Sequence, residues 1–263
     1  MIECRFLVSP EALETSGEMV AVVRDEEHHH LSRVLRLRHG DAVSVFDGAG
    51  RGFRGTIESI AARETRVRLT GPDERAVEPS FQVVLAQGIP HHDRMDLVIQ
   101  KTTEIGVGAI VPIISAHTVP RPGREGRWTR LERWRRVACE AARQSGRLRI
   151  PEIAEPVGWP QFVDGLSESG TQARLIFDPE ADAVAGHAGI TLGAAIRSAL
   201  VAVGPEGGWS ESETALGRDR GFVPLALGPR IMRTETAGII GVAIILFLAG
   251  DLGRAGGPQI PLS

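Results

Sequence analysis

The sequence predicts an α/β protein in which a small β-rich domain precedes a larger domain of alternating strands and helices. Up to about residue 78, apolar residues recur with period two, as in half-buried strands. Beyond that point, short apolar runs alternate with helical patterns, which is typical of a parallel sheet flanked by helices. The chain of 263 residues is long enough for both, and we expect the domains at residues 1–76 and 77–255.

The first domain is expected to be a small barrel. Strands are predicted at residues 42–46, 53–60 and 65–69, and residues 47–52 are predicted to form the hairpin turn between the first two. The glycine and prolines within residues 71–79 predict a linker to the second domain.

The second domain is expected to contain a parallel sheet with helices on its faces. Ser210 and Glu213 form a capping-box pattern that predicts the start of one helix. The apolar run at residues 237–250 is shorter than the roughly 20 residues of a membrane span, so it predicts a buried or interface helix. The remaining pattern predicts strands at 81–86, 109–114, 174–177 and 200–203, and helices at 94–105 and 128–144.

Two unusual loops follow apolar runs in the second half of the chain. Residues 204–208 read Gly-Pro-Glu-Gly-Gly after the strand predicted at 200–203, and residues 227–237 follow the apolar run 223–227. Open α/β sheets bind ligands at the carboxyl ends of their strands, and glycines allow the backbone to approach a ligand closely. The loops therefore predict a cofactor site. The alternative for the first loop is a plain turn before a helix.

Four segments of the chain carry distinctive motifs: HLSRVLR at residues 30–36 with Gly40-Asp41, QKTTEIGV at 100–107, QSGR at 144–147 with IPEI at 150–153, and the two loops GPEGG and LGPRIMRTETA. In this order, they resemble the motifs of the RsmE-type 16S rRNA uridine-N3 methyltransferases of the SPOUT superfamily. The chain departs from the family at residues 90–96, where many relatives have a basic Lys-Gly-x-Lys-like turn and this chain has Pro-His-His-Asp-Arg-Met-Asp.

The resemblance implies a PUA-like β-barrel followed by a SPOUT-type domain with a C-terminal trefoil knot. It also implies a homodimer that uses S-adenosylmethionine (SAM) to methylate N3 of a specific uridine in 16S rRNA of the small ribosomal subunit. The cofactor-binding residues that it implies are Phe177, Gly204, Pro205, Glu206, Gly207, Gly208, Leu225, Leu227, Gly228, Ile231 and Met232. Asp178 and Pro179 are expected to continue the wall formed by Phe177.

Methyl transfer to uracil N3 requires removal of a proton and stabilisation of the negative charge on the imide. Arg233 is the candidate for that stabilisation, and Glu206 or Glu235 is the candidate proton acceptor. For Glu235, the structural alternative is an ion pair with Arg230 or Arg233.

RNA contact is predicted from the distribution of charge rather than from its sum, because the formal net charge is −3. Residues 121–149 contain ten arginines and three glutamates, together with Trp128 and Trp134. The alternative is a solvated amphipathic helix with Trp134 in the core. The predicted RNA-binding residues are Arg5, Arg33, Arg36, Arg94, Lys101, Arg143 and Arg147.

Other classes of site are disfavoured. Cys4 and Cys139 lack ligand spacing, and the consecutive histidines at 28–30, with His91 and His92, are a poor metal set, so no metal is expected. No signal peptide or membrane span is predicted, which favours the cytoplasm. Two alternatives stay open: a non-catalytic RNA-binding protein, and a methyltransferase acting on tRNA or another rRNA nucleotide.

Overall fold

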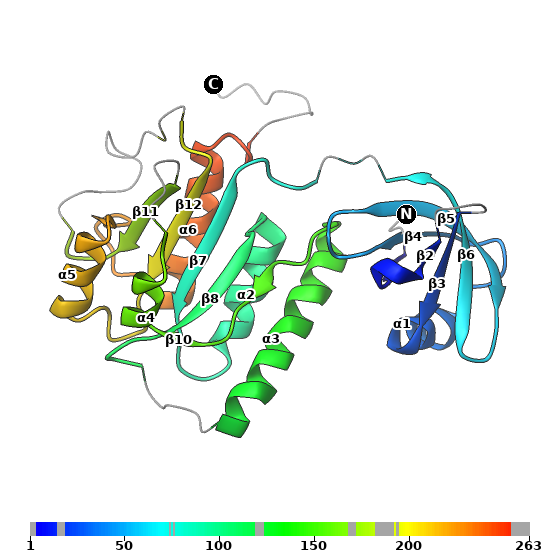
Figure 1. Ribbon diagram of the computed structural model, residues 1–263, viewed down its shortest axis with the longest axis horizontal. Coiled ribbons are helices and arrows are strands. Elements are labelled where there is room, and N and C mark those ends of the chain that lie inside the picture. Colours follow the sequence, from blue (N-terminus) through cyan, green and yellow to red (C-terminus); the bar gives the residue numbers. More distant parts are fainter. Residues whose placement is uncertain are drawn as a thin grey trace. The chain divides into compact units, whose positions relative to one another are not determined.

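The computed structural model describes residues 4–14, 19–73, 75, 77–118, 124–167, 172–181, 192 and 195–253 (Figure 1). The chain forms two compact units. The first consists of Met1–Glu78 and Cys139–Ile150, and the second of Pro79–Ala138 and Pro151–Ser263.

The first unit is built on a six-stranded sheet with the order β1-β4-β5-β6-β3-β2. Only β1 and β4 pair in parallel, and the other neighbours are antiparallel. Within the described residues, β1 and β2 form the two ends of this order, so the predicted barrel is a curved sheet that stays open. Its elements are β1 (Arg5–Leu7), a 3-10 turn (Pro10–Ala12), β2 (Leu13–Glu14), β3 (Val20–Arg24), α1 (Asp25–His29), a π-helical turn (His30–Val34), β4 (Ala42–Phe46), β5 (Gly52–Ile60) and β6 (Glu64–Pro72).

Alternation along these strands produces the core of the first unit. In β6, Thr65, Val67 and Leu69 are buried, whereas the residues between them are at least partly exposed. The predicted hairpin between β4 and β5 is confirmed. Its turn is held by the Asp47 carboxylate, which accepts hydrogen bonds from the backbone N–H groups of Ala49 and Arg51, each at 2.9 Å.

The second unit is built on a parallel sheet with the order β10-β8-β7-β12-β11-β13, and β9 also pairs with β8. The run of alternating strands and helices thus forms the sheet that the sequence predicts. Its elements are β7 (Gln82–Gly88), α2 (Arg94–Ile105), β8 (Ala109–Ile114), α3 (Arg124–Ser145), β9 (Glu152–Ile153), β10 (Val157–Gly158), α4 (Trp159–Asp164), β11 (Gln172–Phe177), β12 (Ser198–Val203), α5 (Glu211–Asp219), β13 (Val223–Leu225) and α6 (Thr234–Leu248).

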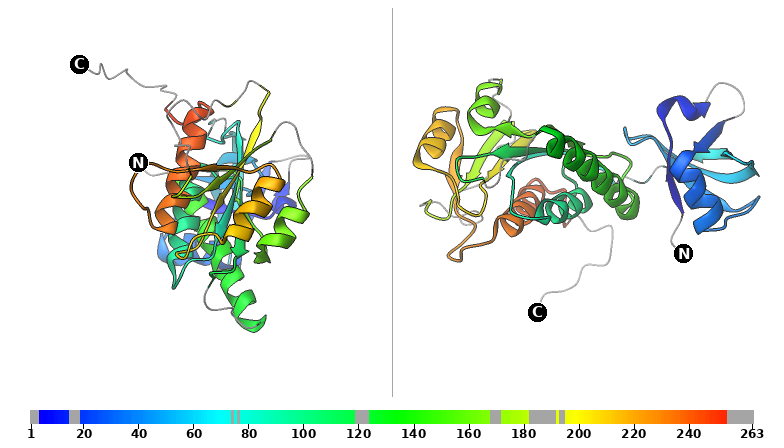
Figure 2. Two further views of the ribbon diagram at one scale, coloured as in Figure 1. Left: turned by 90° about the vertical axis from the view of Figure 1, so that its left-hand side faces the viewer. Right: turned by 90° about the horizontal axis from the view of Figure 1, so that it is seen from below.

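Helices α2 and α6 cover one face of this sheet, and α4 and α5 cover the other (Figure 2). On the α4–α5 face, Trp159 packs among alternate residues of the strands, including Ala86, Ile176 and Ala202. On the other face, α6 lies close to the sheet because it carries glycines where it crosses. A side chain at Gly238 would clash with Gln87, and one at Gly241 with Phe177.

None of the described helices is long and apolar enough to span a membrane. The apolar run at residues 237–250 instead forms most of α6, whose inner residues Val242, Ile245 and Leu246 are fully buried. The sequence prediction of a buried or interface helix therefore agrees with the structure.

Candidate functional site

A cavity of about 290 Å³ opens where β11, β12 and β13 end. Its walls come from three segments that follow these strands, together with the first turn of α6. The lining residues are Phe177, Asp178, Pro179, Val203, Gly204, Pro205, Glu206, Gly208, Leu225, Leu227, Gly228, Arg230, Ile231, Met232, Arg233, Thr234 and Ala237. The two loops singled out in the sequence thus face one cavity, at the edge where parallel sheets place their ligands.

Glycine is required at defined points of these walls. Gly208 and Gly228 have φ angles of +69° and +117°, in the left-handed region that side chains other than glycine rarely adopt. The turn of the first loop closes through a 2.9 Å hydrogen bond from the Gly208 N–H to the Pro205 carbonyl. Beneath it, Gly88 lies so close to Gly204 and Pro205 that any side chain there would clash with their backbone.

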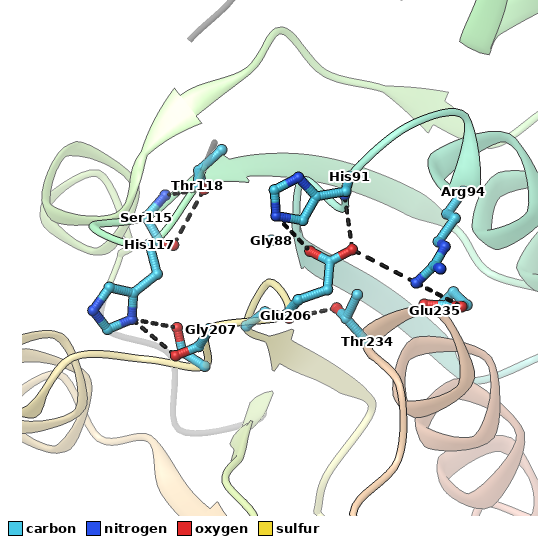
Figure 3. Close-up of polar contacts among 12 residues, drawn as sticks. Gly88, His91, Arg94, Ser115, His117, Thr118, Glu206, Gly207, Thr234 and Glu235 are labelled. Carbon is cyan, nitrogen blue, oxygen red and sulfur yellow. Dashed lines mark hydrogen bonds and ion pairs between the residues drawn. The ribbon is translucent and has the colours of Figure 1, made fainter. Parts of the chain in front are cut away.

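Gly207 has a different environment from the one predicted. It is absent from the cavity lining, and a Cβ atom at this position would lie 2.8 Å from the Cβ of His117. His117 Nδ1 donates to the Gly207 carbonyl at 2.9 Å and lies 3.3 Å from the Gly208 carbonyl (Figure 3). The missing side chain at Gly207 therefore makes room for His117 on the outer side of the loop.

The buried carboxylate of Glu213 connects the loop of His117 to the start of α5. It accepts hydrogen bonds from the backbone N–H of Ala116 at 2.8 Å and of Ser210 at 2.9 Å. The Ser210 hydroxyl in turn accepts from the Glu213 N–H, so the predicted capping box is present. One carboxylate thus stabilises both the loop after β8 and the segment that leaves the glycine loop.

Two acidic residues beside the cavity share a basic partner. Arg94 Nη1 lies 3.4 Å from Glu235 Oε1 and 3.8 Å from Glu206 Oε1 (Figure 3). Glu206 also accepts a 2.8 Å hydrogen bond from the His91 N–H, and its other oxygen lies 3.9 Å from His91 Nε2. The partner of Glu235 in the structure is therefore Arg94, and not Arg230 or Arg233 as the sequence alternative had it.

Arg233 and Glu235 are two positions apart in the motif but lie in opposite environments. Arg233 is exposed, precedes the first residue of α6 and lines the cavity. Glu235 is only 7% exposed and does not belong to the lining. A cation at the mouth of the cavity can stabilise negative charge that develops on a bound group, whereas a buried carboxylate paired with arginine is poorly placed to accept a proton.

Five of the predicted RNA-binding arginines belong to the first unit, and three of them, Arg5, Arg143 and Arg147, make contacts inside it. Arg147 is 4% exposed and pairs with Glu78 at 2.8 Å, and Arg5 donates to the Arg147 carbonyl at 2.9 Å. Arg143 pairs with Glu27, whose pKa is raised because burial disfavours its charged form. These arginines stabilise the first unit. None of their side chains is exposed, and RNA contact by them stays a prediction.

The other predicted RNA-binding residues are more accessible. Arg33 and Arg36 are exposed in the segment after α1. Lys101 is half-buried on α2 and pairs with Glu104 at 2.9 Å, three residues later. On α3, Arg130 and Arg136 are exposed, while Trp134 is buried, as expected for the amphipathic-helix alternative. Trp128 lies outside the side chains that the structure describes.

The histidines do not form a metal site in the described part of the chain, where no group of three or more His, Cys, Asp or Glu residues is placed to hold an ion. His28 is instead buried in the first unit, with its Nδ1 2.9 Å from the Thr65 hydroxyl.

Sequence reasoning missed Gln87, a buried polar residue that contacts Thr234 in the cavity wall. Gln87 ends β7, and its side-chain Nε2 lies 2.8 Å from the Thr234 hydroxyl. The only signal in the sequence was a polar residue at the end of an apolar strand.

Comparisons with known proteins agree with this geometry. A family profile described as the RNA methyltransferase domain matches residues 77–246, and one described as the RNA methyltransferase PUA domain matches residues 23–69.

Relatives named ribosomal RNA small subunit methyltransferase E match most of the chain. The protein of Synechocystis is 32% identical over 92% of this chain and 76% of its own length, and that of Aquifex aeolicus is 36% identical over 89% and 96%. The crystal structure of the Neisseria gonorrhoeae protein of the same name, bound to SAM, superposes with a TM-score of 0.82 at 28% identity, covering 94% of this chain and 98% of that one.

Proposed function

The chain belongs to the RNA methyltransferase family whose members include the ribosomal RNA small subunit methyltransferases E, and from this membership we propose that it methylates N3 of one uridine in 16S rRNA with SAM as donor. The observation that carries the proposal is the cavity formed by the two glycine loops and the start of α6. A protein that only bound RNA would have no use for such a cavity, so the enzyme is preferred to the non-catalytic alternative.

The residues of the cavity fit SAM. Phe177, Leu225 and Ile231 supply apolar surface for an adenine ring, and the backbone of the glycine loops supplies donors and acceptors. Asp178 and Glu206 supply negative charge for a ligand that carries a sulfonium and an ammonium group. When bound, SAM supplies an electrophilic methyl group, and the protein has to align the acceptor with it.

Residues of the protein stabilise the charge on the uracil and accept its proton. Arg233 stabilises the negative charge that develops on the uracil imide when N3 loses its proton. Glu206, which lines the cavity, accepts that proton directly or through water. Glu235 takes the structural role, because it is buried and paired with Arg94.

The proposal extends to the fold and assembly implied by the family. A trefoil knot at the C-terminus is supported by the path of the chain, which leaves the edge strand β13 and returns as α6 to pack on β7 and β12 in the middle of the sheet. A homodimer is supported by apolar side chains that remain exposed on α2, on α6 and just before α6. The exposed fractions are 42% for Leu97, 64% for Phe247 and 88% for Ile231. A substrate of rRNA in turn implies the cytoplasm.

The first experiment supplies labelled SAM and small ribosomal subunits from a strain that lacks this gene. We expect the purified protein to place one methyl group on a uridine N3 of 16S rRNA, identified by mass spectrometry of the digested RNA. If rRNA from the deletion strain still carries its full N3-methyluridine, the proposal is wrong. A methyl group missing from the tRNA pool instead would move the activity to tRNA.

A further inference from the structure

A buried chain of hydrogen bonds connects three segments that are far apart in the sequence. Gln87 is fully buried at the end of β7, and its Nε2 donates to the Thr234 hydroxyl at 2.8 Å and to the Gly88 carbonyl at 3.1 Å. The Thr234 hydroxyl in turn donates to the Gly204 carbonyl. The chain thus runs from the central strand, through the first residue of α6, to the first glycine of the loop after β12.

The chemistry of the acceptors fixes the direction of this chain. The Gly204 carbonyl can only accept, so the single hydroxyl proton of Thr234 must point to it. Thr234 then has only lone pairs to offer Gln87, and the Gly88 carbonyl likewise has only lone pairs. Both contacts therefore require the amide NH₂ group of Gln87, and a carboxylate or a methylene at the same place cannot replace it.

The space around these hydrogen bonds is also restricted. The Gln87 amide oxygen lies against Gly238, where any side chain would clash with it. Gly88 lies against the Gly204–Pro205 backbone in the same way. Two missing side chains therefore allow α6 and the glycine loop to approach Gln87 together.

The chain of hydrogen bonds ends at the cavity. Gly204, Thr234 and Ala237 belong to the lining, and Arg233 is the residue immediately before Thr234. A shift of Thr234 relative to Gly204 would therefore move one wall of the cavity and the arginine assigned to stabilise the imide. Gln87 itself does not line the cavity.

We propose that Gln87 is a positioning residue for methyl transfer, which acts through Thr234 to fix the distance between the Gly204 loop and the start of α6. The inference rests on the function proposed above. In this proposal, the end of β7 fixes the position of Arg233 relative to the Gly204 loop of the cavity wall.

The test removes each link separately. Thr234→Val and Gln87→Met nearly keep side-chain size but remove the hydrogen-bonding groups, and each is expected to weaken SAM binding about tenfold in calorimetry, which corresponds to about 1.4 kcal/mol. Each variant is also expected to lower kcat at saturating SAM and RNA by at least about tenfold, because Arg233 loses its register. Thr234→Ser keeps the hydroxyl and is expected to recover most of both losses.

Thr102→Val is the matched control. Thr102 is fully buried on α2, and its hydroxyl donates to the Val98 carbonyl at 2.7 Å, away from the cavity lining. The control is expected to lose comparable thermal stability while keeping SAM affinity and kcat within about twofold. It separates a local effect on the site from general destabilisation.

The double variant Gln87→Met/Thr234→Val tests whether the two residues act as one chain. If they do, the double variant binds SAM no more weakly than the single variant with the larger loss of affinity. Independent losses would multiply to about a hundredfold. The proposal is overturned if the single variants bind SAM and turn over like the control, or if their effects multiply. A wild-type protein that binds SAM but methylates no rRNA would refute the proposed function, while the calorimetric comparison would still decide the role of Gln87.

Discussion

Replacing Glu78 with alanine is expected to destabilise the first unit by about 3 kcal/mol, the lower end of the range for breaking a buried ion pair. Glu78 Oε2 accepts from Arg147 Nη2 at 2.8 Å and from Nε at 3.2 Å. Oε1 accepts from the backbone N–H groups of Leu148 at 2.8 Å and Arg149 at 2.9 Å. The variant would leave the guanidinium of Arg147, whose side chain is 5% exposed, without this carboxylate; the lower end of the range applies because the Glu78 side chain is 21% exposed.

The effect should depend on pH in a defined direction. Desolvation alone would raise the pKa of Glu78, but the hydrogen bonds from Arg147, Arg149 and Leu148 outweigh it, and the pKa lies below its ordinary value of 4.5. A carboxyl group whose pKa is lowered by folding stabilises the folded state above its unfolded pKa, and this contribution is lost as the pH falls through the folded pKa. The stability difference between wild type and Glu78→Gln should therefore be full at neutral pH and narrow below about pH 4.5.

Urea and thermal unfolding at pH 7 measure the effect, and for a chain of this size about 3 kcal/mol corresponds to a fall in Tm of roughly 6–12 °C. Glu64→Ala is the control in the same unit, because Glu64 pairs with Arg24 at 3.0 Å and the two side chains are 35% and 59% exposed. An exposed pair of this kind contributes less than about 1 kcal/mol. If the Glu78 variant unfolds no earlier than the Glu64 variant, Glu78 does not hold the segment at residues 147–149 in place.

Three further predictions concern the cavity and the RNA. Arg233→Ala should keep SAM affinity in calorimetry but lose methyl transfer, because its task begins only when the uracil is bound; equal losses of both would assign it to cofactor binding instead. Gly207→Val should displace His117 and weaken SAM binding in a folded protein. Gly71→Val is the control and should bind SAM normally, because an added Cβ there meets nothing within 4 Å. Unchanged SAM binding by the Gly207 variant would show that binding does not depend on the packing of this loop against His117. Lys101→Arg should stay within about 0.5 kcal/mol of wild-type stability because it can still pair with Glu104, while its rate of rRNA methylation falls; wild-type turnover would make Lys101 an ordinary surface residue.

The sequence predicted the parts of the fold that depend on local pattern. The helix at residues 94–105 and the strand at 109–114 have the predicted bounds, because each has a clear period and glycine or proline close to its ends. The two loops could be placed at one edge of the sheet because the carboxyl ends of parallel strands meet there.

The contacts of individual charged residues could not be predicted in the same way. The partner of Glu235 is Arg94, which is 141 positions earlier in the sequence, and the partner of Arg147 is Glu78, 69 positions earlier. Residues 139–150 belong to the first unit although residues 139–145 are the last part of α3, a helix that starts in the second unit. Such choices are made by three-dimensional packing, and one-dimensional periodicity carries no signal for them.

Three glycines, Gly204, Gly208 and Gly228, contribute only main chain to the cavity wall, and the last two have backbone angles that other residues rarely adopt. An inhibitor that takes its polar contacts from these backbone groups would meet few positions at which resistance could arise. No substitution removes a backbone carbonyl, and only proline removes a backbone N–H. A side chain at a positive φ strains the loop that the enzyme itself needs. Selectivity among related enzymes would then have to come from the side chains at the rim, such as Arg230 and Ile231.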